Sequence, residues 1–204
     1  MDRSPLIRFK GQRDPSGYHF ADSEYGRLIV ANSDRRVSCQ PLTGDEFRVF
    51  ANIAGNPEGA LDFVQQYGPV SFVAEKIGDR VEGINQGARA MRRLLDAVAD
   101  RQWMSDERAE NLTKAPLGLG MLNFGFVWDP ARKAPVWSFQ AMCLRDALWL
   151  QFGQAMMRGA QLRACLHCAD WFEAGVGTGR RADAKFCSDE HRVAFNSLKR
   201  SKGD

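Results

Sequence analysis

The sequence predicts an α+β fold with mostly antiparallel strands, followed by a small cysteine-rich module. Over residues 1–160, short apolar runs bounded by turn-forming residues alternate with amphipathic helical segments. Residues 161–204 instead contain one close Cys–Cys pair and one close Cys–His pair, in a segment rich in Arg, Gly and Ala. We therefore expect a larger α+β domain over 1–160 and a separate C-terminal module over 161–204.

Two pairs of strands are predicted in the larger domain. Residues 27–31 and 37–40 are apolar and flank three turn-forming residues, so we expect them to form a β-hairpin. Residues 121–128 and 135–139 are rich in aromatic and β-branched side chains and flank a second turn. They predict another antiparallel hairpin.

Four helices are predicted in the same domain. Thr43 and Glu46 form a capping box that indicates a helix start, and Asn56-Pro57 indicates a second one. A long helix is expected over 77–103 and a last one over 140–159. The long helix has a stripe at alternating steps of three and four that predicts a buried face: Val81, Ile84, Ala88, Met91, Leu95 and Val98.

Charge is distributed unevenly along the chain. Residues 1–157 hold 19 Lys and Arg against 19 Asp and Glu, whereas residues 158–204 hold 9 against 6. The net positive charge therefore lies in the C-terminal module, as is typical of a phosphate-binding surface. No apolar run is long enough to span a bilayer, and the first residues lack the apolar stretch of a secretory signal, so we expect a cytoplasmic protein with reduced cysteines.

Four residues of the module have the types and spacing of a zinc site. Cys165 and Cys168 are separated by two residues, and Cys187 and His191 by three. Zinc binds thiolate and imidazole groups tetrahedrally, and such spacing lets one short turn present two donors to one ion. We predict one structural Zn²⁺ that stabilises a segment too small for a core of its own. His167 is the alternative fourth ligand, although side chains between the cysteines of a knuckle usually point outward.

The order of elements in the module predicts a treble-clef finger. The first cysteine pair would lie on a knuckle, and residues 171–173 and 185–186 would pair as a hairpin. Ser188 would cap a terminal helix, with Cys187 and His191 facing the same ion across its start.

The module also resembles a known group of zinc fingers. Cys165-x2-Cys168, Trp171-Phe172 and the stretch 183–192 are similar to the C-terminal finger of bacterial proteins related to the CGNR-type fingers. Those fingers are regarded as transcription regulators, so the resemblance implies a DNA-binding regulatory protein. His191 stands where these fingers usually have Cys, Ala169 where a knuckle commonly has Gly, and the Cys-Gly-Asn-Arg motif is absent.

Six cations of the module are candidates for contacts with nucleic acid. A Gly-rich loop and a terminal helix could follow a phosphate backbone, and the resemblance favours DNA over RNA. The alternative is that loop and tail are simply solvated. The candidates are Arg180, Arg181, Lys185, Arg192, Lys199 and Arg200.

A second hypothesis is a protein-interaction or homodimerisation module attached to a domain that binds a small molecule. Exposed Trp171 and Phe172 would favour it, whereas buried they would form the core of the module. The tryptophans at 128, 137 and 149 are expected in the core of the larger domain, with a ligand pocket as the alternative. A metal-dependent enzyme is less favoured, since three thiolates and an imidazole close the coordination shell of zinc and no catalytic motif is present, so no catalytic residue is named.

Overall fold

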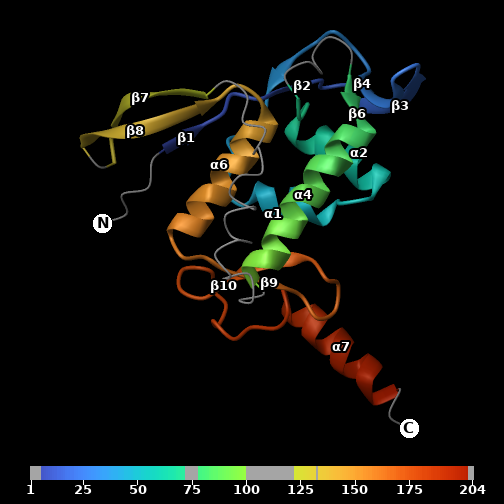
Figure 1. Cartoon of the computed structure of the whole chain (residues 1–204), viewed down its shortest axis with the longest axis vertical. Helices are drawn as coiled ribbons and strands as arrows, with labels where there is room; N and C mark the ends of the chain where they lie inside the picture. Colours follow the sequence, from blue (N-terminus) through green and yellow to red (C-terminus); the bar gives the residue numbers. More distant parts are fainter. Residues whose placement is uncertain (1–5, 72–77, 100–121, 132, 202–204) are drawn as a thin grey trace, which may run out of the picture.

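The computed structural model describes residues 6–71, 78–99, 122–131 and 133–201 and has the predicted mixed α+β architecture, with small, mostly antiparallel sheets. Figure 1 shows the order of its elements along the chain. The strands are β1 (Leu6–Arg8), β2 (Gln12–Arg13), β3 (Tyr18–Ser23), β4 (Gly26–Ala31), β5 (Val37–Ser38), β6 (Asp79–Arg80), β7 (Leu122–Asp129), β8 (Ala134–Ala141), β9 (Gln161–Ala164) and β10 (Trp171–Ala174). The helices are α1 (Glu46–Asn52), α2 (Pro57–Tyr67), α4 (Val81–Ala99), α6 (Leu144–Met157) and α7 (Asp189–Ser201).

The sheets lie at two ends of a helical layer. One three-stranded sheet has the order β1-β8-β7, with β8 antiparallel to β7 and parallel to β1. The other has the order β3-β4-β6 and is antiparallel throughout. In Figure 1 both lie above helices α1, α4 and α6, whereas the two-stranded sheet of β9 and β10 lies below them and α7 extends beyond it.

The main core forms where α1 packs against both α4 and α6, and α2 packs against α4. The predicted stripe on α4 is confirmed, because five of its six residues are buried and the sixth, Val98, is partly buried. Phe47 and Phe50 of α1 face it with exposed fractions of 0% and 1%. Helix α2 contributes Phe63, and α6 contributes Leu144 and Leu148.

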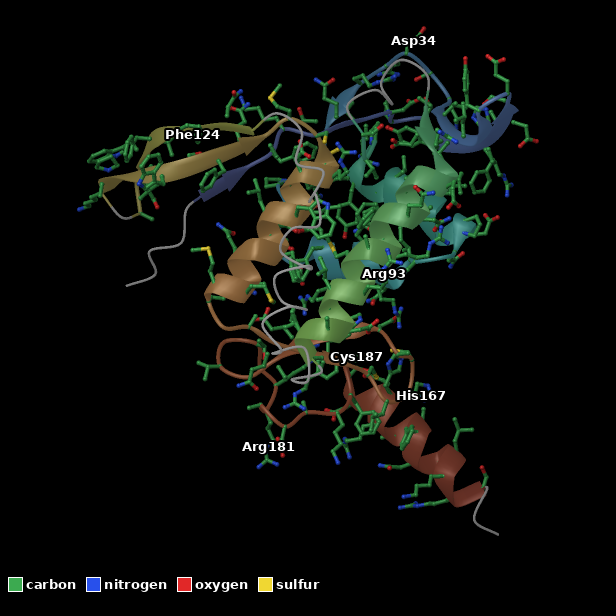
Figure 2. All side chains as sticks on the ribbon, viewed as in Figure 1. Asp34, Arg93, Phe124, His167, Arg181 and Cys187 are labelled. Carbon is green, nitrogen blue, oxygen red and sulfur yellow. The ribbon has the colours of Figure 1, made fainter. Side chains whose placement is uncertain are left out.

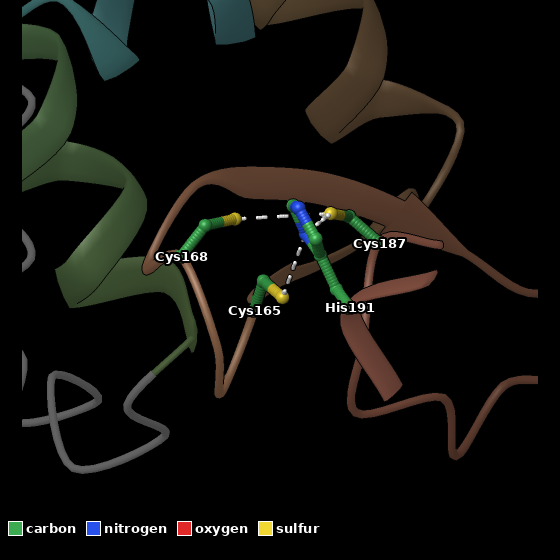
Figure 3. Close-up of side chains that lie close together, drawn as sticks. All are labelled: Cys165, Cys168, Cys187 and His191. Carbon is green, nitrogen blue, oxygen red and sulfur yellow. Dashed lines mark hydrogen bonds between the residues drawn. The ribbon is translucent and has the colours of Figure 1, made fainter. Parts of the chain in front are cut away.

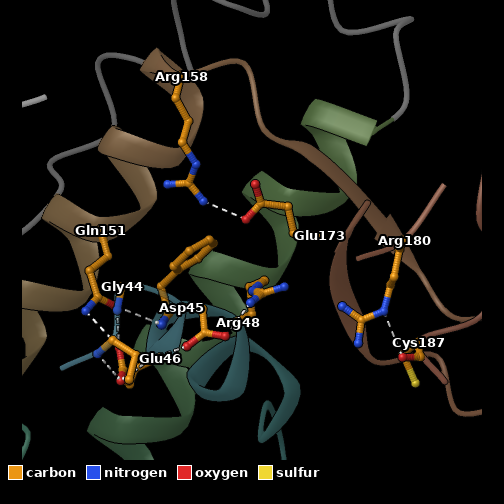
Figure 4. Close-up of polar contacts among 11 residues, drawn as sticks. Gly44, Asp45, Glu46, Arg48, Gln151, Arg158, Glu173, Arg180 and Cys187 are labelled. Atoms are coloured by element: carbon orange, nitrogen blue, oxygen red, sulfur yellow. Dashed lines mark hydrogen bonds and ion pairs between the residues drawn. The ribbon is translucent and has the colours of Figure 1, made fainter. Parts of the chain in front are cut away.

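Polar side chains fix the helix starts. The side chain of Asn56 accepts a hydrogen bond from the N–H of Gly59 at 3.1 Å, which confirms the predicted cap of α2. At α1 only half of the predicted capping box forms: Glu46 Oε1 accepts from the Thr43 N–H at 2.7 Å, but the Thr43 hydroxyl donates to the same carboxylate. Gln151 of α6 donates to Glu46 at 2.9 Å and so ties the two helices together (Figure 4).

Three expectations are corrected by the pairing of strands. The expected hairpin of 27–31 with 37–40 is wrong. Strand β4 instead pairs with β3 across a two-residue turn at 24–25 that ends at Gly26, where φ is 95°, and β5 pairs with β2. The long helix begins at Val81 because β6 immediately before it pairs with β4; residue 77 and residues 100–103 lie outside the described residues. The last helix begins at Leu144 because the chain up to Ala141 belongs to β8.

The hairpin of β7 and β8 is confirmed, but its tryptophans are not where we expected them. Trp149 of α6 is buried in the main core, whereas Trp128 and Trp137 are 62% and 50% exposed. Among the described helices, none has both the length and the apolar character needed to cross a membrane.

Candidate metal centre

The structure brings the four predicted ligands together at one point. The sulfur atoms of Cys165, Cys168 and Cys187 and a ring nitrogen of His191 all lie within 4.8 Å of one another. Figure 3 shows the four side chains converging from the knuckle and from the start of α7. This Cys3His group could hold one metal ion, and zinc is the ion that such a donor set favours.

Two of three donor separations are close to those around one tetrahedral ion, and the third is shorter. Zinc–sulfur bonds of about 2.3 Å and a zinc–nitrogen bond of about 2.0–2.1 Å place two sulfurs about 3.8 Å apart, and sulfur and nitrogen about 3.6 Å apart. The Cys168 and Cys187 sulfurs are 3.8 Å apart. Nδ1 of His191 lies 3.9 Å from the Cys165 sulfur and 2.9 Å from the Cys187 sulfur, which identifies Nδ1 as the nitrogen that faces the site.

His167 is outside this group. Its backbone N–H donates to the Cys165 sulfur at 3.4 Å, as expected for a residue inside a knuckle. Its ring lies 4.9 Å from the ring of His191, centroid to centroid. Of the two candidate histidines, His191 is the one whose nitrogen lies among the three sulfurs.

The electrostatics of the three thiols favour a cation at the site. Burial opposes ionisation of Cys165, but hydrogen bonds from the backbone N–H groups of Cys168, Cys187 and His167 outweigh it and lower its pKa to about 6. Burial and the neighbouring thiols raise the pKa of Cys168 to about 12. Burial, with Cys165 beside it, also raises the pKa of Cys187. Without a cation, only one of the three cysteines is therefore a thiolate at neutral pH. A bound dication would offset the repulsion among three thiolates and so favour ionisation of all three cysteines.

The knuckle lies in the turn of a hairpin, which corrects the predicted pairing. Strand β10 pairs with β9, from Trp171 opposite Ala164 to Ala174 opposite Gln161. Residues 185–186 form no strand; the carbonyl of Lys185 instead accepts from the N–H of Leu166 at 3.0 Å. The knuckle itself turns through Ala169, whose φ of 61° lies in the left-handed region that favours Gly.

Ser188 begins α7 as predicted. Its hydroxyl accepts from the His191 N–H at 3.2 Å, which fixes the turn that carries His191. The α7 helix has no buried residue, and Phe195 contacts Phe186 with ring centroids 5.3 Å apart. The helix is therefore attached to the rest of the module mainly at its first turns.

Several contacts tie the knuckle hairpin to the larger domain. Leu162 and Trp171 belong to the main core, with exposed fractions of 5% each, and the Trp171 N–H donates to Asn52 at 2.8 Å. Arg158, directly after α6, pairs with Glu173 at 2.6 Å (Figure 4). Arg92 of α4 donates to the carbonyl of Ala169 at 3.0 Å. Because Phe172 is buried as well, neither aromatic residue of the hairpin offers the exposed anchor of the interaction hypothesis.

The six predicted cations are all exposed, but they differ in their contacts. Arg180 donates from Nε to the carbonyl of Cys187 at 3.0 Å and lies over the ring of Phe172, so it supports the fold of the module. Arg192 pairs with Asp189 at 3.1 Å. The remaining four make no ion pair with any described residue: Arg181, Lys185, Lys199 and Arg200.

An open groove of about 720 Å³ runs beside the metal site between the Gly-rich loop and the start of α7. Its lining includes Arg180, Arg181, Lys185 and Arg192 against the single carboxylate of Asp189. Figure 2 shows Arg181 pointing away from the module at this side. The fold brings four of the six predicted cations to one groove, whereas Lys199 and Arg200 lie further along α7 and do not line it.

No family model, curated protein or solved structure matches the chain. The resemblance to the CGNR-type fingers therefore rests on the motif of the module alone.

Proposed function

We propose that the chain is a DNA-binding regulatory protein whose C-terminal module, 161–204, is a treble-clef finger held by one structural Zn²⁺. The observation that carries the proposal is the Cys3His group between the knuckle and α7, with a groove lined by cations beside it. Three thiolates and one imidazole fill the coordination shell of zinc, so the ion would hold the fold and leave no position for catalysis. The resemblance to the CGNR-type fingers points the same way.

The position of α7 supports binding to the DNA duplex. A helix of 13 residues is about 20 Å long and fits the major groove, which admits one α-helix. None of its residues is buried, and Figure 1 shows it extending away from the rest of the molecule. Arg192 and Lys199 are seven residues apart and therefore share one side of the helix.

The groove and the helix would have different roles. Arg181 and Lys185 make no ion pair within the described residues and line the groove at the start of α7. They are suited to contact phosphates, which gives affinity but no sequence preference. Side chains along α7 would then be left to contact base edges.

The test is binding of the zinc-loaded protein to labelled random-sequence duplex at low and physiological salt, with a chelated sample beside it. We expect binding that weakens with salt and is lost on chelation. The variant Arg181→Ala with Lys185→Ala should keep its zinc and lower the slope of log affinity against log salt by about 2. Arg180 is left in place because it holds the carbonyl of Cys187.

A matched control removes two exposed cations elsewhere, Lys10→Ala with Arg93→Ala, and should bind like the parent protein. Absence of binding by the zinc-loaded parent would contradict the proposal. Equal losses in both double variants would mean that binding follows net charge and has no defined surface.

A further inference from the structure

One face of the β7–β8 hairpin carries five aromatic side chains and a proline. Residues directly opposite each other on antiparallel strands share a face, and the register places Phe124 opposite Phe139, Phe126 opposite Trp137 and Trp128 opposite Pro135. These six residues carry no charge, and their only polar groups are the indole N–H groups of the two tryptophans; we call them the aromatic face. The rings of Phe126 and Trp137 are 4.3 Å apart, centroid to centroid, so the side chains at the centre of the aromatic face already pack against each other.

The aromatic face is exposed to solvent. Phe124, Phe126, Trp128 and Trp137 have exposed fractions of 72%, 65%, 62% and 50%. Antiparallel sheets with one side in water normally place polar residues on that side. Here apolar rings are exposed on one side, while the opposite face carries Asn123 and Gln140, which are exposed as well, and Ser138, which is buried. Figure 2 shows Phe124 on the part of the hairpin that extends away from the helices.

The exposed area is large enough for an interface. Each aromatic side chain can bury about 150–250 Å², so the four residues expose on the order of 500 Å². A single patch of that size is at the upper end for a monomer and usually marks an interaction site. Two such patches packed together would bury about 1,000 Å², the lower limit for a specific protein–protein interface.

We propose that the aromatic face packs against the same face of a second copy of this chain, about a twofold axis. A face without charge, whose only hydrogen-bonding groups are two indole N–H donors, offers little to select a different partner, whereas its apolar surface is complementary to itself. Twofold dimers use one patch twice in this manner. The two sheets would stack about 10 Å apart with their side chains interdigitated, as in a β-sandwich. This dimer is independent of zinc and of nucleic acid.

The test is the mass of the full chain by sedimentation over a range of concentrations. We expect twice the 22.9 kDa of one chain, and a return to one chain for Phe126→Glu, which places a charge at the centre of the aromatic face. The matched control is Asn123→Glu, the same new charge at an exposed position on the opposite face of the same strand, which should stay dimeric. Emission from Trp128 and Trp137 should shift to longer wavelength only in Phe126→Glu.

A parent chain that sediments as one copy at every concentration would overturn the proposal. A dimer that survives Phe126→Glu, or one that both variants dissociate equally, would also overturn it, because the aromatic face would then not be the contact.

Discussion

The two halves of the metal module are held in different ways, although each supplies two of the four donor atoms. The half with Cys165 and Cys168 is a hairpin whose Leu162 and Trp171 are part of the main core. The half with Cys187 and His191 leads into α7, which buries no residue. The first half is positioned by the larger domain and the second mainly by its contacts at the metal site.

This difference indicates what a metal ion would do in the molecule. A structural ion stabilises by joining segments that cannot bury enough apolar surface to stay together. Here it would attach a free helix to a hairpin that is already fixed. The small cluster of Cys165, Phe172 and Ala174 buries too few atoms to do this alone.

The largest effect is expected for Cys187→Ala. The variant should lose stoichiometric zinc and the order of α7, while the main core and β9–β10 stay folded. Metal analysis of the purified protein, together with amide hydrogen exchange along the chain, measures both. The matched control is Cys39→Ala, a cysteine outside the cluster, which should keep its zinc. Unfolding of the whole chain by Cys187→Ala would show that the two halves are not held separately.

Trp171→Ala and Phe172→Ala test the same comparison in the half of the module that contains Cys165 and Cys168. Neighbouring residues on β10 point to opposite faces, and Trp171 enters the main core whereas Phe172 enters the small cluster beside the cysteines. Trp171→Ala should lower the free energy of unfolding of the larger domain by about 3–5 kcal/mol. Phe172→Ala should leave that transition unchanged and weaken zinc retention. Denaturant unfolding, followed by one probe in the larger domain and one in the metal module, distinguishes the two effects. If each variant destabilised both regions equally, the two halves of the module would not be held separately.

The metal site could be predicted from the sequence because each ligand pair is local. In a knuckle, and at the start of a helix, the spacing in the sequence is enough to bring two donor atoms to one ion, independently of the rest of the fold. The strand partners were missed because pairing is not decided by local spacing. Strand β10 pairs with β9 across the knuckle, whereas residues 185–186, Lys and Phe, were expected to be a strand from the order of elements in a treble clef.

The exposure of the aromatic side chains could not be predicted from the sequence either. Aromatic residues on β7 and β8 correctly indicated strands, but strand preference does not say which face is covered. Trp149 lies on a helix with packed neighbours and is buried, whereas Trp137 lies on a hairpin that extends from the body and is exposed. The contacts of Arg180 with Cys187 and Phe172 could likewise be found only from the fold.

The affinity for zinc should rise with pH. In the metal-free cluster at neutral pH, Cys165, with a pKa of about 6, is a thiolate, whereas Cys168, with a pKa of about 12, is protonated. The pKa of Cys187 is raised too, so zinc must displace two protons from these thiols. Affinity should then increase about 100-fold per pH unit, about 2.7 kcal/mol, and more steeply below the pKa of Cys165. Calorimetry in buffers of different ionisation enthalpy counts the protons, and a count near zero would contradict the ligand set.

The smallest effect is expected at Ala169. Its φ of 61° is a left-handed conformation that costs a residue with a Cβ about 1–2 kcal/mol, and glycine avoids this cost but loses more chain entropy on folding. Ala169→Gly should therefore stabilise the knuckle by about 1 kcal/mol, measured as slower loss of zinc to a chelator. The control is Ala164→Gly in strand β9, where glycine has no conformational advantage and should speed the loss. Because Arg92 contacts only the carbonyl of residue 169, both variants keep the link to α4, and faster loss from Ala169→Gly would mean that the turn is not strained.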